Sequence, residues 1–71
     1  MLHDILMHEW YSYQKNHMGQ EPNLIIMNHD TWYRLVDELL GYKYLNQPAN
    51  TYRGKPIYRS DDVGKDKFIV G

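Results

Sequence analysis

The sequence predicts an α+β fold: an N-terminal helix, then a strand, a second helix and two or three short strands, with the strands in a small mixed or antiparallel sheet packed by both helices. Three observations support it. Apolar residues recur at steps of three and four near the N-terminus, a short apolar run follows Pro22, and a second helical pattern follows Asn28. A chain of 71 residues is expected to form one domain, 1–71.

The first helix is predicted over residues 2–18, with Gly19 as its stop. Its main face has helical spacing and consists of Leu2, Ile5, Leu6, Trp10, Tyr13 and His17. Met7, Tyr11 and Met18 form a second, weaker stripe, which either widens the core face or binds a partner, since Met and Tyr are enriched in the cores of interfaces. Partner binding requires all three side chains to be exposed, and Met7→Ser or Tyr11→Ser must then weaken association without unfolding the chain.

A strand–helix–strand core is predicted over residues 23–71. Residues 24–27 are apolar at every position, which predicts a strand covered on both faces and therefore central in its sheet. Asn28 is the predicted N-cap of the second helix, with its side chain accepting from the N–H of Thr31. Trp32 opens the apolar face of this helix. We therefore expect Trp32 to be largely buried against the strand and Trp32→Ala to cost about 3–5 kcal/mol.

The end of the second helix and the short strands after it are predicted from the residues that favour turns between them. The apolar face of the helix continues through Leu35, Val36, Leu39 and Leu40, and Gly41 is its predicted C-terminal residue. Residues 41–50 are predicted to form a loop. Two short strands are predicted around Gly54 and Pro56, at residues 51–53 and 57–59. A polar turn at residues 60–67 and a last strand at residues 68–70 are predicted to follow.

Composition excludes several classes of protein. Eight Lys and Arg against nine Asp and Glu give no overall positive field for nucleic acid or membranes. Without Cys, neither disulfides nor a thiolate zinc site can form, which favours a reducing compartment, the cytoplasm of a host cell. The N-terminus lacks the features of a signal peptide, and no segment approaches the roughly 20 apolar residues of a membrane span. We expect no contact with membranes.

No catalytic or metal-binding motif is apparent. The four His residues do not have zinc-protease spacing, because Ser12 stands where the second His would be needed. Asp61, Asp62 and Asp66 lack the alternating ligands of a calcium loop. No nucleophile elbow or glycine-rich phosphate loop is present. We therefore expect a protein that is not an enzyme and has no catalytic residue, cofactor or metal.

One local basic segment is a candidate polyanion patch. Lys43, Arg53, Lys55 and Arg59 lie among Tyr42, Tyr44, Tyr52 and Tyr58, the mixture of charge and rings used to bind single-stranded nucleic acid. The alternative is that the Tyr rings pack across strands while the basic groups are solvated. Asp61 and Asp62 weaken the local field, so nucleic-acid binding is the third hypothesis for function.

Four segments together resemble one protein family. The order "IIMNHDTW", "GYKYL", "YRGKPIYRSDDV" and "KFIVG" is similar to the core of tailed-phage major capsid proteins of the Hong Kong type, with the first helix in the place of their spine helix. His29 stands where the family usually has Pro, and the chain has no room for an axial domain, extended loop or N-terminal arm. The residues that match are Asn28, Trp32, Gly41, Tyr44, Leu45, Gly54, Pro56, Ile57, Val70 and Gly71.

The resemblance implies a phage or prophage origin and a small stand-alone version of the peripheral domain. The first hypothesis is a non-enzymatic structural or assembly protein that acts by protein–protein contact, with phage head components or as a homo-oligomer, and is therefore associated with virions. The alternative is a small phage effector that binds and inhibits a host protein. The sequence does not separate the two, and the neighbouring genes would: head genes favour assembly, and early genes favour the effector.

Overall fold

Two helices and four strands make up the described part of the structure, a computed structural model that covers residues 1–39 and 51–71. The predicted α+β fold is confirmed. The predicted cap Gly41, the apolar Leu40 and the predicted loop 41–50 lie outside the described residues. In chain order the elements are α1 (Leu2–Asn16), β1 (Ile25–Met27), α2 (His29–Leu39), β2 (Thr51–Tyr52), β3 (Lys55–Arg59) and β4 (Phe68–Val70).

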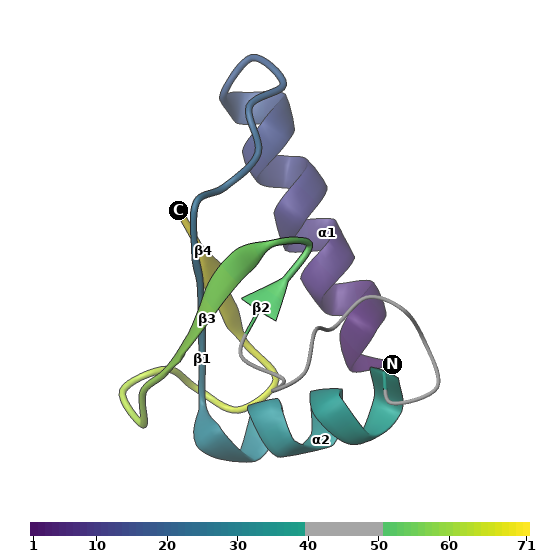
Figure 1. Ribbon diagram of the computed structural model, residues 1–71, viewed down its shortest axis with the longest axis vertical. Helices are drawn as coiled ribbons and strands as arrows, with labels where there is room; N and C mark the ends of the chain where they lie inside the picture. Colours follow the sequence, from purple (N-terminus) through teal and green to yellow (C-terminus); the bar gives the residue numbers. More distant parts are fainter. Residues whose placement is uncertain (40–50) are drawn as a thin grey trace.

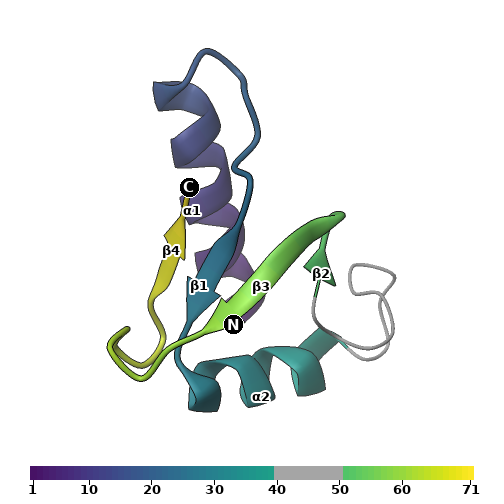
Figure 2. The same cartoon turned by 60° about the vertical axis from the view of Figure 1, so that its left-hand side comes forward.

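The strands form one mixed sheet in the order β2-β3-β1-β4 (Figure 2). β1 is parallel to β3 and antiparallel to β4, so its predicted central place is confirmed. β2 and β3 form an antiparallel hairpin whose turn needs the left-handed backbone of Arg53 and Gly54, at φ 52° and 80°. Arg53 adopts this conformation although it has a Cβ, while Gly54 does so without steric cost.

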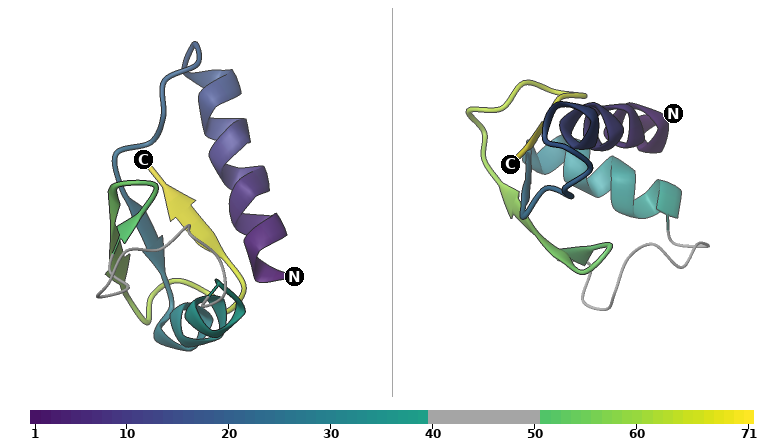
Figure 3. Two further views of the ribbon diagram at one scale, coloured as in Figure 1. Left: turned by 45° about the vertical axis from the view of Figure 1, so that its right-hand side comes forward. Right: turned by 90° about the horizontal axis from the view of Figure 1, so that it is seen from above.

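The helices lie on one side of this sheet, which we call the inner face (Figures 1 and 3). α1 runs alongside the sheet and contacts α2 and β4, and α2 crosses below the ends of the strands. The core between them is apolar and consists of Leu2, Leu6, Trp10, Ile25, Met27, Leu35, Leu39, Tyr52, Ile57 and Phe68. No described helix lies on the opposite, outer face, so the prediction that β1 is covered on both faces was wrong: Ile25 and Met27 are buried, but Ile26 between them is only partly buried.

The start of α1 is held by a side chain from α2. The backbone N–H groups of Leu2 and His3 donate to the two carboxylate oxygens of Glu38, at 3.1 and 3.3 Å. These N–H groups have no partner within the helix, and a carboxylate at a helix N-terminus also interacts favourably with the helix dipole. Glu38 therefore fixes the two helices relative to each other at the N-terminal end of α1.

α1 ends two residues before the predicted Met18. The N–H groups of His17 and Gly19 both donate to the Gln14 carbonyl oxygen, at 3.2 and 2.7 Å, which closes the helix. Met18 and Gly19 then take left-handed φ values of 57° and 86°. Gly19 thus stops the helix as predicted, but the reversal begins one residue earlier than the glycine.

Asn28 caps α2, although not through the predicted bond. Its Oδ1 accepts from the N–H of Asp30 at 2.9 Å, and its Nδ2 donates to the Val63 carbonyl oxygen at 3.1 Å. Thr31 is fully buried, and its Oγ1 accepts from the N–H of Asp66 at 2.9 Å. Asn28 and Thr31 thus tie the turn 60–67 to the start of α2.

The buried tryptophan is Trp10, not Trp32. Trp10 is 1% exposed, whereas Trp32 is only partly buried beneath the guanidinium of Arg59, which lies 4.3 Å from the centre of its ring. The prediction that Trp32 is largely buried was wrong because the inner stripe of α2 is Thr31, Leu35 and Leu39, at steps of four. Trp32 lies beside this stripe and covers its edge.

We predict that Trp10→Ala lowers the free energy of unfolding by about 3–5 kcal/mol, because it leaves a large cavity between α1 and the sheet. In a domain this small, that loss unfolds much of the population at 25 °C. Trp32→Ala removes a ring that is only partly buried and should cost less. Urea titrations followed by circular dichroism compare the two variants, and an equal or larger loss for Trp32→Ala would contradict the assignment of Trp10 as the central core residue.

Candidate interaction surfaces

The outer face of the sheet carries a row of apolar side chains across three strands. The register pairs Ile26 with Tyr58 of β3 on one side and with Ile69 of β4 on the other. Paired residues point to the same face of a sheet, and side chains alternate along each strand. Leu24 and Pro56 therefore form a second row beside the first. We call the five residues Leu24, Ile26, Pro56, Tyr58 and Ile69 the outer-face set.

This set is uncovered among the described residues. Tyr58 is 54% exposed and Ile69 51% exposed, while Ile26, Leu24 and Pro56 are partly buried. Figure 2 looks onto this face, with α1 behind the sheet and α2 below it. Sequence reasoning missed the set because it treated residues 24–27 as covered on both faces. The sequence of β4 carried no signal of it, because Phe68 and Ile69 are both apolar and only the structure shows that Phe68 is buried and Ile69 exposed.

Charged side chains of opposite sign flank one end of the outer-face set. Asp61 and Asp62 follow the end of β3, and Lys67 precedes the start of β4. Because Met27 pairs with Arg59 on one side and with Phe68 on the other, the turn that carries the acidic pair and Lys67 passes the end of β1 (Figure 2). All three are exposed and form no ion pair with any described residue, unlike the neighbouring Asp66, which pairs with Arg34.

The predicted partner stripe is not one continuous exposed surface. Met18 is 99% exposed but lies in the turn after α1, Tyr11 is 48% exposed, and Met7 is partly buried. The Tyr11 hydroxyl accepts from the Arg53 guanidinium at 3.5 Å. The requirement that all three side chains be exposed is therefore not met, because Met7 packs partly into the domain.

The predicted basic patch is divided in the structure. Lys43 lies outside the described residues. Arg53, in the β2–β3 turn, lies 5.6–5.8 Å from the ring centres of Trp10, Tyr11 and Tyr52, whereas Arg59 lies over Trp32 at the opposite end of β3. Lys55 is partly buried. The two arginines thus hold helices against the sheet through cation–π contacts rather than forming one surface for a polyanion.

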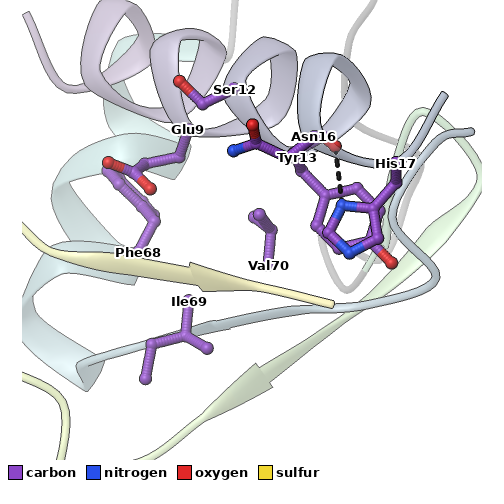
Figure 4. A pocket seen from close by; sticks show the side chains of 8 residues that line it. All are labelled: Glu9, Ser12, Tyr13, Asn16, His17, Phe68, Ile69 and Val70. Atoms are coloured by element: carbon purple, nitrogen blue, oxygen red, sulfur yellow. Dashed lines mark hydrogen bonds between the residues drawn. The ribbon is translucent and has the colours of Figure 1, made fainter. Parts of the chain in front are cut away.

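An open groove of about 340 Å³ lies between α1 and the edge strand β4 (Figure 4). Phe68 and Val70 point toward α1, and Ile69 points away from it. His17 stacks on Tyr13 with ring centres 3.8 Å apart, and its Nδ1 donates to the Tyr13 carbonyl oxygen at 2.8 Å, which leaves Nε2 as the acceptor of the neutral ring. No hydrogen bond joins Ser12 to Glu9 or His17, so this described geometry does not activate the Ser12 hydroxyl.

His3 links α1 to the hairpin. Its Nε2 lies 2.8 Å from the Tyr52 hydroxyl, and the two rings meet edge to face at 5.8 Å. Burial lowers the pKa of His3 below its ordinary value, and the nearby Arg53 lowers it further, against the opposing effects of the Glu38 and Asp4 carboxylates. The neutral imidazole is therefore the form that the fold favours.

Comparison with known proteins gives no relative: no family model, curated protein or solved structure matches the chain. Across residues 1–39 and 51–71, no helix is both long and apolar enough to cross a membrane. Over the same residues, no three His, Asp or Glu side chains gather into a group that could hold a metal ion.

We predict that His3 makes the fold less stable in mild acid. Because its pKa is lower in the folded chain than in the unfolded chain, protonation favours unfolding. The contribution of His3 is fully present above pH of about 6.5 and is lost as the pH falls below that value. His3→Gln cannot titrate, so the loss of stability between pH 7.5 and pH 5 should be smaller in this variant. Urea midpoints at the two pH values measure the difference, and an identical loss in both proteins would contradict this role.

Proposed function

We propose that this chain is a non-enzymatic structural or assembly protein that acts by protein–protein contact, the role implied by its resemblance to the peripheral domain of phage capsid proteins. The observation that carries the proposal is the outer-face set. Exposed apolar residues are ordinary when they are scattered, but a contiguous group on one face is typical of interaction sites.

The outer-face set has the properties that favour binding. Strand pairing fixes Ile26, Tyr58 and Ile69 in one row, so little backbone entropy is lost when a partner covers them. Tyr58 combines a large apolar ring with a polar hydroxyl, as do many residues that dominate binding energy. Charged groups at one end of the row, rather than within it, resemble the polar rim of an interface.

We predict that the double variant Tyr58→Ser and Ile69→Ser loses partner binding and remains folded, because both side chains are half exposed and neither belongs to the core. The measurement is retention of co-expressed phage capsid components on the tagged chain, with circular dichroism as the test of folding. Ile5→Ser is the matched control, since Ile5 is 41% exposed on α1, away from the outer face.

The expected result is retention by the wild type and by Ile5→Ser, and loss in the double variant. Two results would overturn the proposal. One is a wild-type chain that retains no capsid component and stays monomeric in light scattering at all concentrations. The other is unchanged retention in the folded double variant, which would move binding away from the outer face.

A further inference from the structure

We propose that an extended segment of a partner protein adds to β4 as a further strand, along the groove between α1 and β4, with a basic side chain beside Glu9. This site is separate from the outer-face contact, so either can fail alone. β4 is an edge strand, because the order β2-β3-β1-β4 gives it one neighbour. Figure 2 shows no described strand beyond β4, and α1 lies behind the sheet rather than beside it. A peptide strand can therefore pair with β4 at this edge.

The free edge of β4 presents four backbone groups at the spacing of a strand. The Leu24 carbonyl oxygen accepts from the N–H of the residue after β4 at 3.2 Å, so the backbone groups of Leu24 face β4. Hydrogen-bonded and non-hydrogen-bonded pairs alternate along antiparallel strands, so Ile26 and Ile69 form the next hydrogen-bonded pair. The N–H and C=O groups of Phe68 and Val70 therefore point away from β1. Over residues 1–39 and 51–71, no turn, loop or side chain bonds to them.

An antiparallel partner strand can use all four groups. One of its residues forms a hydrogen-bonded pair with Val70, and the residue two positions later forms one with Phe68. Paired residues point to the same face, and Phe68 and Val70 point toward α1 (Figure 4), so both partner side chains enter the groove. The partner residue between them pairs with Ile69 and points to the outer face. Donors and acceptors at this spacing fit an extended backbone, which makes a peptide the ligand of this edge.

Glu9 selects the partner side chain opposite Phe68. Its carboxylate lies beside the Phe68 ring in Figure 4. Glu9 is partly buried and forms no ion pair with any described residue. Among the described residues that line the groove, none is Lys or Arg. A partly buried carboxylate without a counter-ion favours a cation, so we expect Lys or Arg opposite Phe68. Opposite Val70, toward Tyr13, an apolar side chain fits better.

The charges of the neighbouring turn 60–67 do not replace this ion pair. Asp66 pairs with Arg34, and the Lys67 stem lies 3.4 Å from the place of a Cβ on Gly64. With Asp66 paired, two acidic and two basic groups of the turn remain, so the turn adds little net field. None of its described residues lines the groove. The charged residues of the turn besides Asp66 and Lys67 are Asp61, Asp62 and Lys65, all exposed.

A synthetic peptide with capped ends tests the inference. Its sequence is Thr-Thr-Val-Val-Lys-Thr-Thr, in which Val, Val and Lys stand opposite Val70, Ile69 and Phe68. The contact is small, so we expect a dissociation constant of roughly 0.1–1 mM. Titration of the isotope-labelled chain by nuclear magnetic resonance measures this constant. At saturation the amide hydrogens of Phe68 and Val70 should exchange about tenfold more slowly than in the free chain, because both become donors to the peptide.

A charge exchange tests the role of Glu9. Glu9→Lys should bind this peptide about tenfold more weakly than the wild type at low salt. A second peptide with Glu in place of Lys should bind Glu9→Lys about as tightly as the first binds the wild type. Asp37→Lys is the matched control, because Asp37 is an exposed acidic residue of α2 that does not line the groove, and it should bind both peptides as the wild type does. Circular dichroism establishes that each variant is folded.

N-methylated peptides test the strand pairing without any change to the protein. N-methylation of the Lys removes the N–H that donates to the Phe68 carbonyl oxygen and should weaken binding at least about tenfold. N-methylation of the second Val removes an N–H that points away from β4, so this peptide should bind within about twofold of the parent.

Three results would overturn the inference. One is no binding of the Lys peptide at about 5 mM. The second is equal binding of the two N-methylated peptides, which would mean that no strand is added. The third is protection of the Phe68 and Val70 amides that rises with the concentration of the chain alone, which would assign the edge to a second copy. Each of these results leaves the proposed function standing, because retention of capsid components is measured through Tyr58 and Ile69 on the outer face.

Discussion

The pairing of β1 with β3 on one side and β4 on the other is the constraint on which the rest of the structure depends. β1 has three residues, and it pairs with β3 and β4, which both come from the C-terminal part of the chain. Ile25 and Met27, the first and last residues of β1, are fully buried beneath the helices, while Ile26 between them points to the outer face. One short strand therefore organises the core and at the same time fixes the row of side chains on the outer face.

The sequence predicted the elements better than it predicted which side chains fill the core. The apolar run before Asn28 and the amphipathic pattern after it predict a central strand followed by a helix, and both are present. The two tryptophans could not be ranked in the same way, since both lie on apolar faces. Their burial depends on the rotation of each helix about its axis, which is set by long-range contacts such as Glu38 with the start of α1 and Thr31 with Asp66.

The candidate surfaces were harder to predict for the same reason. Helical spacing groups Met7 with Tyr11, but whether such a stripe is covered depends on what packs beside the helix; here Arg53 from the hairpin reaches Tyr11. The basic residues around β3 are close in sequence, yet a strand is extended and carries Arg53 and Arg59 to opposite ends, each to its own aromatic partner. The outer-face set combines residues from three strands, and only the register of the sheet brings Tyr58, Ile26 and Ile69 into one row.

The open outer face follows from the size of the domain. A sheet has two faces, and because the two described helices lie on the same side, residues 1–39 and 51–71 of this chain cover only one of them. A larger protein of this class would cover the second face with another layer of its own chain, since stable domains are built from layers that bury their apolar faces. In this chain the register keeps apolar side chains on the uncovered face. The proposed protein–protein contact would supply the layer that covers this face.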